Sequence, residues 1–168
     1  MNQLDFNAFV VSEKNDKFIS EIKSIKQTKL DDGKVLISVK YSSLNYKDAL
    51  SASGNRGVTR EYPHTPGIDA VGEVVESNSS EFEVGEKIVV TGYDLGMNTS
   101  GGFGQYISIP ANWAISLPKD LSGAEAMSIG TAGLTAGLCV RKLLTVSYTH
   151  LRAHETGRNL VCRLLLEK

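Results

Sequence analysis

The sequence has few of the residues that form disulfides or bind transition metals. Two cysteines, Cys139 and Cys162, occur in 168 residues, and they fit neither a disulfide framework nor a zinc spacing. No run of about 18 apolar residues is present, so we expect no membrane-spanning helix. Residues 1–16 show no basic segment followed by an apolar one, so we expect no secretory signal. A reducing cytoplasm is the predicted compartment.

A phosphate-binding loop is also lacking. Neither G-x-G-x-x-G nor a P-loop occurs anywhere in the sequence. The segment Gly101-Gly102-Phe103-Gly104 has the wrong spacing, and the glycines at 130, 133 and 137 are typical of helix packing. Nothing in the sequence is therefore predicted to bind a pyrophosphate at a helix N-terminus.

The sequence also lacks a large excess of either charge, since its net charge is −1. Residues 1–140 contain 12 Lys/Arg and 17 Asp/Glu, whereas residues 141–168 contain six and two. A basic C-terminal arm that binds nucleic acid is one interpretation of this change of sign. A join between two unrelated sequences is the interpretation we favour, and we expect no nucleic-acid partner.

What is present is a series of short strands with turns between them. This pattern predicts a mainly β protein with short helices (α+β), an all-β sandwich or a partly closed barrel. Asp32-Gly33 is a hairpin signal, and Gly72 inside a strand indicates a bulge or a close backbone approach. The predicted strands are 5–11, 18–25, 35–41, 68–76, the end of 83–91, 105–110 and 114–117.

Two helices are expected. Residues 45–52 form the first, with Asn45 as N-cap and Asp48 three positions later. The second runs from 124 to 144, with a capping box formed by Ser122 and Glu125. We expect it to be broken or loosened near Gly130 and Gly133.

Three blocks carry a family resemblance. They are SSLNYKDAL at 42–50, PGIDAVG at 66–72 and GTAGLTA at 130–136. In this order they resemble the medium-chain dehydrogenase/reductase superfamily, in its YhdH/YhfP quinone-oxidoreductase branch, which is related to acryloyl-CoA reductases. The resemblance extends from about residue 5 to residue 144.

The resemblance implies a division of the chain. Residues 1–120 would be a GroES-like, partly closed β-barrel that carries the substrate cleft. Residues 121–145 would be the helix that leads into a Rossmann domain, which holds NADPH in this family and is missing here. Residues 146–168 resemble translated sequencing-adaptor DNA, and we interpret them as a non-native tail.

The resemblance also points to site residues. It implies that Tyr46 contacts the cofactor near the nicotinamide and that Thr131 approaches the nicotinamide ribose. Asn45 is the catalytic candidate, with its amide facing the reacting carbonyl. Each has a structural alternative: Tyr46 as a tyrosine of the first helical turn, Thr131 as a helix-packing residue and Asn45 as a helix cap only.

No metal site is expected. Zinc-dependent relatives place a cysteine in the neighbourhood of Asn45 and a histidine before the position of Asp69. Here those positions hold no thiolate and no imidazole, and His64 is the only histidine before the tail. One histidine and one carboxylate do not make a three-ligand catalytic zinc site. We interpret Asp69 as structural.

The expected function follows from the resemblance. The intact protein would be a zinc-independent, NADPH-dependent oxidoreductase that reduces a quinone or an enoyl/acryloyl-CoA by hydride transfer. We expect a small-molecule substrate, no membrane partner and a homodimer for the intact protein, and an inactive 168-residue chain. The alternative is a non-catalytic orphan β-barrel with no specific ligand.

Overall fold

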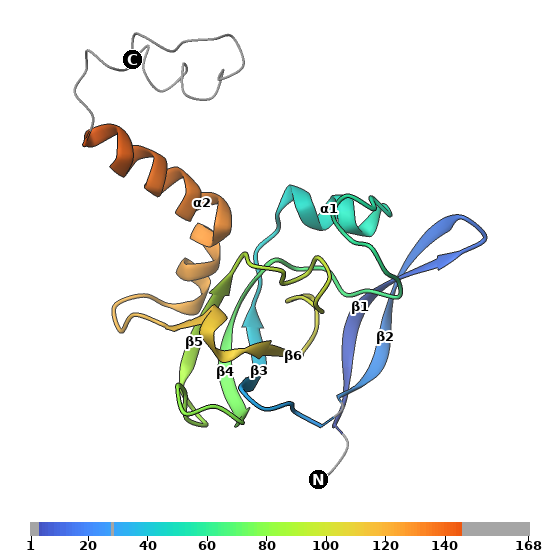
Figure 1. Ribbon diagram of the computed structural model, residues 1–168, viewed down its shortest axis with the longest axis horizontal. Coiled ribbons are helices and arrows are strands. Elements are labelled where there is room, and N and C mark those ends of the chain that lie inside the picture. The colour runs from blue at the N-terminus through green and yellow to red at the C-terminus, as the bar shows by residue number, and fades with distance from the viewer. Residues whose placement is uncertain (1–3, 28, 146–168) are drawn as a thin grey trace. The chain divides into compact units, whose positions relative to one another are not determined.

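The computed structural model describes residues 4–27 and 29–145, which form seven strands, one 3₁₀ turn and two α-helices (Figure 1). The chain divides into two compact units, residues 1–133 and 134–168. The elements are β1 (Leu4–Lys14), β2 (Lys17–Gln27), β3 (Lys34–Tyr41), α1 (Tyr46–Ala52), β4 (Asp69–Ser77), β5 (Lys87–Thr91), β6 (Tyr106–Pro110), η1 (Ala111–Trp113), β7 (Ala114–Ser116) and α2 (Gly123–Leu144).

The first two strands form a long antiparallel hairpin. Lys14 pairs with Lys17, and the two residues between them, Asn15 and Asp16, have φ of 52° and 58°. Positive φ at both central residues is the geometry of the two-residue turn that matches strand twist, and Asn and Asp tolerate it. The sequence pattern predicts both strands but not this turn.

The hairpin predicted at Asp32-Gly33 is wrong. A turn is present there, with Gly33 at φ 74°, but the strands on either side belong to different sheets. β2 pairs with β1, while both edges of β3 are occupied, one by β4 and the other by β6. Because β3 has no free edge for β2, the turn joins two sheets.

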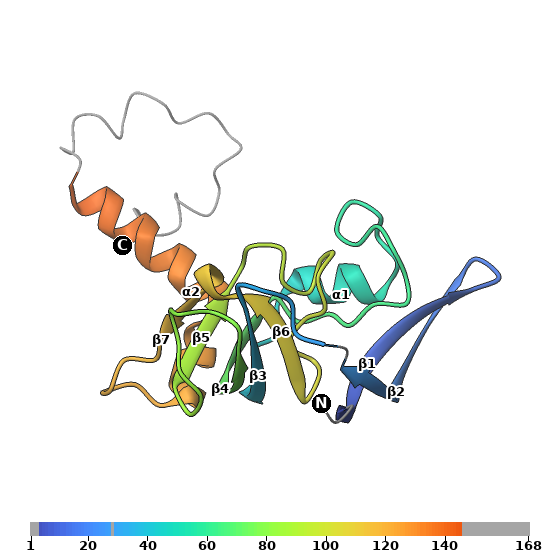
Figure 2. The same cartoon turned by 60° about the horizontal axis from the view of Figure 1, so that its bottom comes forward.

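The larger sheet has five antiparallel strands in the order β6-β3-β4-β5-β7 (Figure 2). β1 extends the structure by bonding to segments outside this sheet. Phe9 N donates to Phe103 O at 2.8 Å, and Val11 exchanges two hydrogen bonds with His64. The partly closed arrangement predicted from the sequence is confirmed: the sheets do not close into a continuous barrel.

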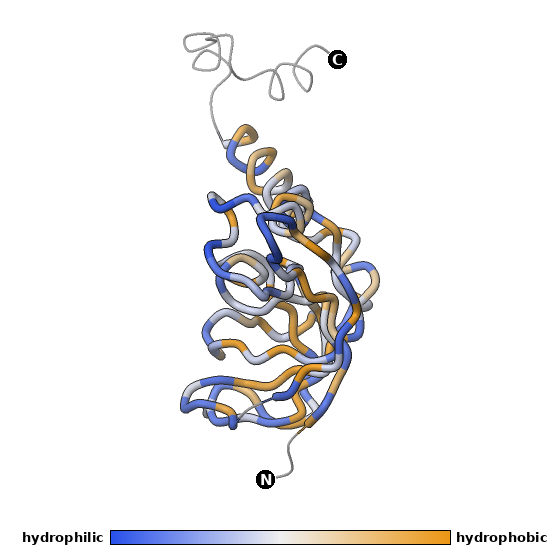
Figure 3. The backbone as a smooth tube through the Cα atoms, turned by 90° about the vertical axis from the view of Figure 1, so that its right-hand side faces the viewer, coloured by the Kyte–Doolittle hydropathy of each residue, from blue (hydrophilic) through white to orange (hydrophobic). Residues whose placement is uncertain are grey.

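One face of the five-stranded sheet forms the main core. Alternate residues point inward, as Val35 and Ile37 do on β3 and Ile88 and Val90 do on β5, and all four are at most 1% exposed. Figure 3 shows hydrophobic and hydrophilic stretches following one another along the backbone. Burial of this face is the main force that holds the strands together.

Gly72 shows both features predicted for it. The β3–β4 register shifts between Val39 and Tyr41, next to the Val39–Gly72 pair. A Cβ at Gly72 would also overlap the carbonyl oxygen of Ser38. The missing side chain therefore lets β4 approach β3 closely at the bulge.

Both helices begin as predicted. Asn45 caps α1, and at the start of α2 the hydroxyl of Ser122 accepts from Glu125 N at 3.2 Å while the Glu125 carboxylate accepts from Ser122 N at 2.9 Å. The predicted break lies at Gly130, whose φ of 50° and ψ of −166° are not helical. In the second unit, residues 134–144 are helical, with Leu138 and Leu144 exposed.

Candidate functional site

The centre of the candidate site is the carboxylate of Asp69, at the start of β4. Asp69 is 1% exposed and accepts three hydrogen bonds. Ser43 Oγ donates to Oδ2 at 2.8 Å, Thr131 N donates to Oδ2 at 3.0 Å, and Thr131 Oγ1 donates to Oδ1. A buried carboxylate is tolerated when donors surround it in this way. Asp69 thus joins the segment before α1 to α2.

Gly130 makes this junction sterically possible. A Cβ at Gly130 would lie 2.6 Å from Ser43 Oγ and 3.0 Å from Asp69 Oδ2. Its positive φ also lies in a region that side-chain-bearing residues rarely adopt. The break in α2 turns the N–H of Thr131 toward Asp69, so the carboxylate caps the helical turn that restarts after Gly130.

Asn45 uses one end of its side-chain amide as a helix cap. Its Oδ1 accepts from Lys47 N at 3.1 Å, while its own N–H donates to Asp48 Oδ2 at 2.7 Å. Because the N–H of Lys47 donates to the side-chain oxygen of Asn45, the Nδ2 group of the same amide points away from Lys47 N. Nδ2 donates to no residue that the structure describes. The two interpretations of Asn45 are therefore compatible: Oδ1 caps the helix and Nδ2 is available to a ligand.

Asp48 fixes the start of α1 against the loop before β4. Besides Asn45 N, its carboxylate accepts from Gly67 N at 3.0 Å and Ile68 N at 3.1 Å. Burial raises the pKa of Asp48 above its ordinary value, against the lowering effect of these three N–H donors. Asp48 and Asp69 together hold Asn45 and Thr131 in fixed positions relative to β4.

A pocket of about 430 Å³ lies between the segment before α1 and the first half of α2. Asn45, Ser43, Asp69, Met127 and Gly130 are among its lining residues. Such a volume is within the range of small-molecule sites. The pocket therefore brings the catalytic candidate together with the carboxylate that binds Thr131.

The three predicted site residues are not equally close to this pocket. Asn45 lines it, and Thr131 is connected to it through Asp69. Tyr46 lies in the first turn of α1, is 76% exposed and is not among the lining residues. Ser43 is a site residue that was not predicted from the sequence, although it lies in the block at 42–50. No local pattern shows that its hydroxyl reaches Asp69.

His64 has a structural environment. It is 7% exposed, and its Nε2 lies 2.9 Å from the carbonyl oxygen of Gly96, so this nitrogen carries the proton. Burial lowers the pKa of His64 below its ordinary value.

Among residues 4–27 and 29–145, no three His, Cys, Asp or Glu side chains come together as a metal site would require. His150 and His154, whose spacing of four positions would suit a metal-binding pair on a helix, lie outside the described residues.

Two aromatic residues stack beside the end of β5. The rings of Tyr93 and Trp113 are 5.4 Å apart between centroids and 6° from parallel. Trp113 packs against the main core, whereas Tyr93 is 59% exposed and has φ of 53°. Its neighbour Gly92 approaches Thr131, whose Oγ1 would lie 3.9 Å from a Cβ at Gly92.

Neither helix in the described part of the chain is both long and apolar enough to cross a membrane.

Comparison with known proteins places this geometry in a family. Residues 31–119 match the alcohol dehydrogenase GroES-like domain. The chain is 42% identical over 138 residues to the putative quinone oxidoreductase YhfP of Bacillus subtilis and 41% identical over 140 residues to the acrylyl-CoA reductase AcuI of Ruegeria pomeroyi. Each match covers 82% of this chain and 42% of the relative.

A solved structure shows the same fold. The yhdH oxidoreductase of Salmonella enterica, crystallised in complex with NADP, superposes with a TM-score of 0.77 at 37% identity. That match covers 82% of this chain and 42% of the other. The chain thus spans about two-fifths of the length of its relatives. It belongs to the alcohol dehydrogenase GroES-like domain family, in the branch of the medium-chain dehydrogenase/reductases that contains YhfP and AcuI.

Proposed function

We propose that residues 1–120 are the substrate domain of a zinc-independent, NADPH-dependent reductase and that residues 121–145 lead into its cofactor-binding domain. Its substrate is an electron-poor quinone or an α,β-unsaturated carbonyl compound such as an enoyl-CoA. When NADPH is bound, it supplies the hydride. The relatives support this proposal, since they are described as a quinone oxidoreductase, an acrylyl-CoA reductase and an oxidoreductase in complex with NADP.

The observation that carries the proposal is that the two ends of the Asn45 side-chain amide have different roles. Its Oδ1 holds the helix cap, and its Nδ2 is left as a donor in a residue that lines the 430 Å³ pocket. Hydride addition to an enone or a quinone places negative charge on the substrate oxygen. A fixed N–H donor stabilises such charge without a metal.

The residues around Asp69 support zinc independence. Both carboxylate oxygens already accept hydrogen bonds from Ser43 and Thr131. A metal ligand at this position would have to give up these bonds. Thr131 donates its hydroxyl hydrogen to Asp69, so toward a ribose hydroxyl its oxygen acts as an acceptor. Tyr46 offers an exposed phenol that can contact the cofactor.

We further propose that the complete enzyme is a cytoplasmic homodimer and that the 168-residue chain is inactive by itself. The second candidate function is therefore a barrel that binds no specific ligand. This candidate concerns the 168 residues taken by themselves, which span 42% of the length of each relative. A rise in the Tm of the chain with millimolar NADPH would exclude this second candidate, since a ligand that binds the folded state raises the Tm.

The experiment that tests the enzymatic function is a chimera. Residues 1–144 are joined to the unmatched part of YhfP, and NADPH oxidation is followed at 340 nm with acryloyl-CoA or a benzoquinone as acceptor. We expect turnover with at least one acceptor and no change on addition of a zinc chelator. A folded chimera that binds NADPH and reduces neither acceptor would contradict the proposal.

A further inference from the structure

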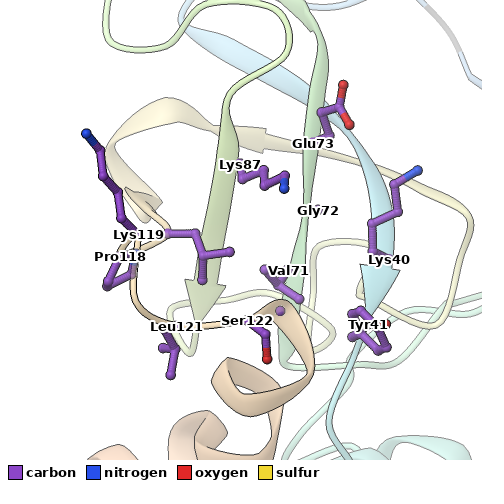
Figure 4. A pocket seen from close by; sticks show the side chains of 12 residues that line it. Lys40, Tyr41, Val71, Gly72, Glu73, Lys87, Pro118, Lys119, Leu121 and Ser122 are labelled. Carbon is purple, nitrogen blue, oxygen red and sulfur yellow. The ribbon is translucent and has the colours of Figure 1, made fainter.

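A second, larger hollow lies on the face of the five-stranded sheet opposite the main core (Figure 4). Its volume is about 570 Å³, within the range of sites for drug-sized ligands. We call it the lysine groove, because Lys40 on β3, Lys87 on β5 and Lys119 before α2 all line it. Figure 4 shows Lys87 reaching toward Gly72 on β4, with Lys40 and Lys119 on opposite sides.

The charge of the groove is unbalanced. Three lysines and one carboxylate, that of Glu73, line it, which gives a net lining charge of +2. Glu73 lies opposite Lys87 in the β4–β5 pairing, but the two form no ion pair within the described part of the chain. Lys119 likewise has no partner there, and Lys40 reaches only the hydroxyl of Ser38, at 3.3 Å. These ammonium groups are therefore free to bind an anion.

The groove also has an apolar side. Val71, Leu117 and Leu121 line it together with the ring of Tyr41, which is 53% exposed. An exposed aromatic ring beside lysines suits a planar, phosphorylated ligand, because the ring can stack while the ammonium groups bind phosphate.

The lysine groove adjoins the candidate active-site pocket. Tyr41 lines both hollows. Ser122 and Gly123 line the groove, and the next residue, Ala124, lines the pocket. A long ligand can therefore pass over Tyr41, with one end beside Asn45 and the other among the lysines. A free quinone has no group that would reach them.

We propose that the lysine groove binds the phosphorylated adenosine of a coenzyme A thioester whose acyl group reacts beside Asn45. The inference rests on the proposed function and chooses among its substrates: an enoyl-CoA rather than an uncharged quinone. NADPH also carries a phosphorylated adenosine, so the test must separate these two sources of the same chemistry.

The test uses the full 168-residue chain labelled with ¹⁵N. Amide shifts are followed at low salt during titration with coenzyme A, with 3′-dephospho-coenzyme A and with NADP⁺. We expect coenzyme A to shift the amides of Tyr41, Lys87 and Leu121. Loss of the 3′-phosphate should weaken binding, and added salt should do so too, because the contacts are exposed.

Charge variants give the matched control. Lys87→Gln and Lys119→Gln should each weaken coenzyme A binding about three-fold, as expected for loss of one exposed charge contact. Lys14→Gln removes the same charge at the exposed end of β1 and should leave the affinity unchanged. Undisturbed spectra of the free variants establish that they remain folded.

Three outcomes would overturn the inference. One is the absence of shifts at millimolar coenzyme A, and another is binding that Lys87→Gln and Lys14→Gln weaken equally. The third is that NADP⁺ shifts the same amides and binds with an affinity at least equal to that of coenzyme A, which would assign the groove to the cofactor. Failure of the proposed function looks different: the chimera would not oxidise NADPH, while coenzyme A binding to the chain would still depend on Lys87.

Discussion

Asp69 and Thr131, 62 positions apart in sequence, are joined by two hydrogen bonds, one from the backbone N–H of Thr131 at 3.0 Å and one from its hydroxyl. The first bond caps the helical turn that begins after Gly130, and the second fixes the direction in which the Thr131 hydroxyl points. A single buried carboxylate therefore holds both the backbone and the hydroxyl of a residue that we propose to lie at the cofactor.

Replacing Asp69 with alanine should destabilise the chain strongly. The change leaves the Ser43 hydroxyl and both Thr131 donors without an acceptor, and each buried donor left unpaired costs about 1–3 kcal/mol. We expect a loss of roughly 3 kcal/mol in the free energy of unfolding, measured by urea denaturation.

Two controls accompany this measurement. Asp120→Ala removes an exposed carboxylate outside this network and should change stability by less than about 0.5 kcal/mol. Thr131→Val, combined with Asp69→Ala in a double-mutant cycle, should show strong coupling. Additive effects of the two substitutions would contradict the direct connection.

Gly130→Ala should be far more harmful than Gly137→Ala, although both glycines lie in α2. Alanine at 130 combines a positive φ with a contact of 2.6 Å to Ser43 Oγ, whereas a Cβ at 137 meets nothing within 4 Å. We expect Gly130→Ala to cost at least about 2 kcal/mol. Gly137→Ala should be neutral or stabilising by up to about 1 kcal/mol. Thermal melts of the two variants test this, and equal Tm values would exclude the special role of Gly130.

Acidification should destabilise the chain through His64. Burial lowers its pKa in the folded protein, whereas the nearby Asp94 charge opposes the shift, and Tyr62 packs edge-on against its ring. The folded state thus disfavours the protonated ring. The stability that His64 contributes is complete above the ordinary pKa of 6.5 and is lost as the pH falls from there toward the folded pKa.

The measurement is the Tm between pH 7.5 and pH 5 for the unsubstituted chain and for His64→Gln. We expect the decline in Tm with falling pH to be steeper for the unsubstituted chain. The raised pKa of Asp48 has the opposite effect on stability, because protonation of Asp48 at low pH favours the folded state. Asp48 is present in both proteins, so its contribution cancels in the comparison. Parallel Tm curves would contradict the assignment.

Asn45→Ser separates the two roles of Asn45. Serine is as good a helix cap as asparagine, so the Tm should change little. It cannot supply the Nδ2 donor. In the chimera with YhfP we expect kcat to fall on the order of 100-fold, the size of effect that loss of one oxyanion donor has. An unchanged kcat would leave Asn45 as a cap only.

The strands and helices could largely be predicted because their signals are local. Alternation marks β3 and β6, and the Ser122–Glu125 pair marks the start of α2. The hairpin at Asp32-Gly33 was predicted wrongly, because a turn signal does not say which edges are already occupied. β3 already has β4 and β6 on its two sides, and no feature of residues 29–34 reports this.

The candidate site was predictable only in part. The block at 42–50 pointed to Asn45, and the cap formed with Asp48 was correctly predicted. The connection of Ser43, Asp69 and Thr131 depends on hydrogen bonds between residues 26 and 62 positions apart, which no spacing rule describes. Interpreting Asp69 as structural agrees with its three hydrogen bonds. Whether Tyr46 and Thr131 contact a cofactor stays a prediction.

The stack of Tyr93 on Trp113 has a practical consequence. Trp113 is the only tryptophan in the sequence, so its fluorescence comes from one known place, the junction between the end of β5 and the turn η1. Unfolding separates the two rings and exposes the indole to water. The emission spectrum therefore provides a label-free optical signal for the folding of the barrel, with which every variant described above can be compared on one scale.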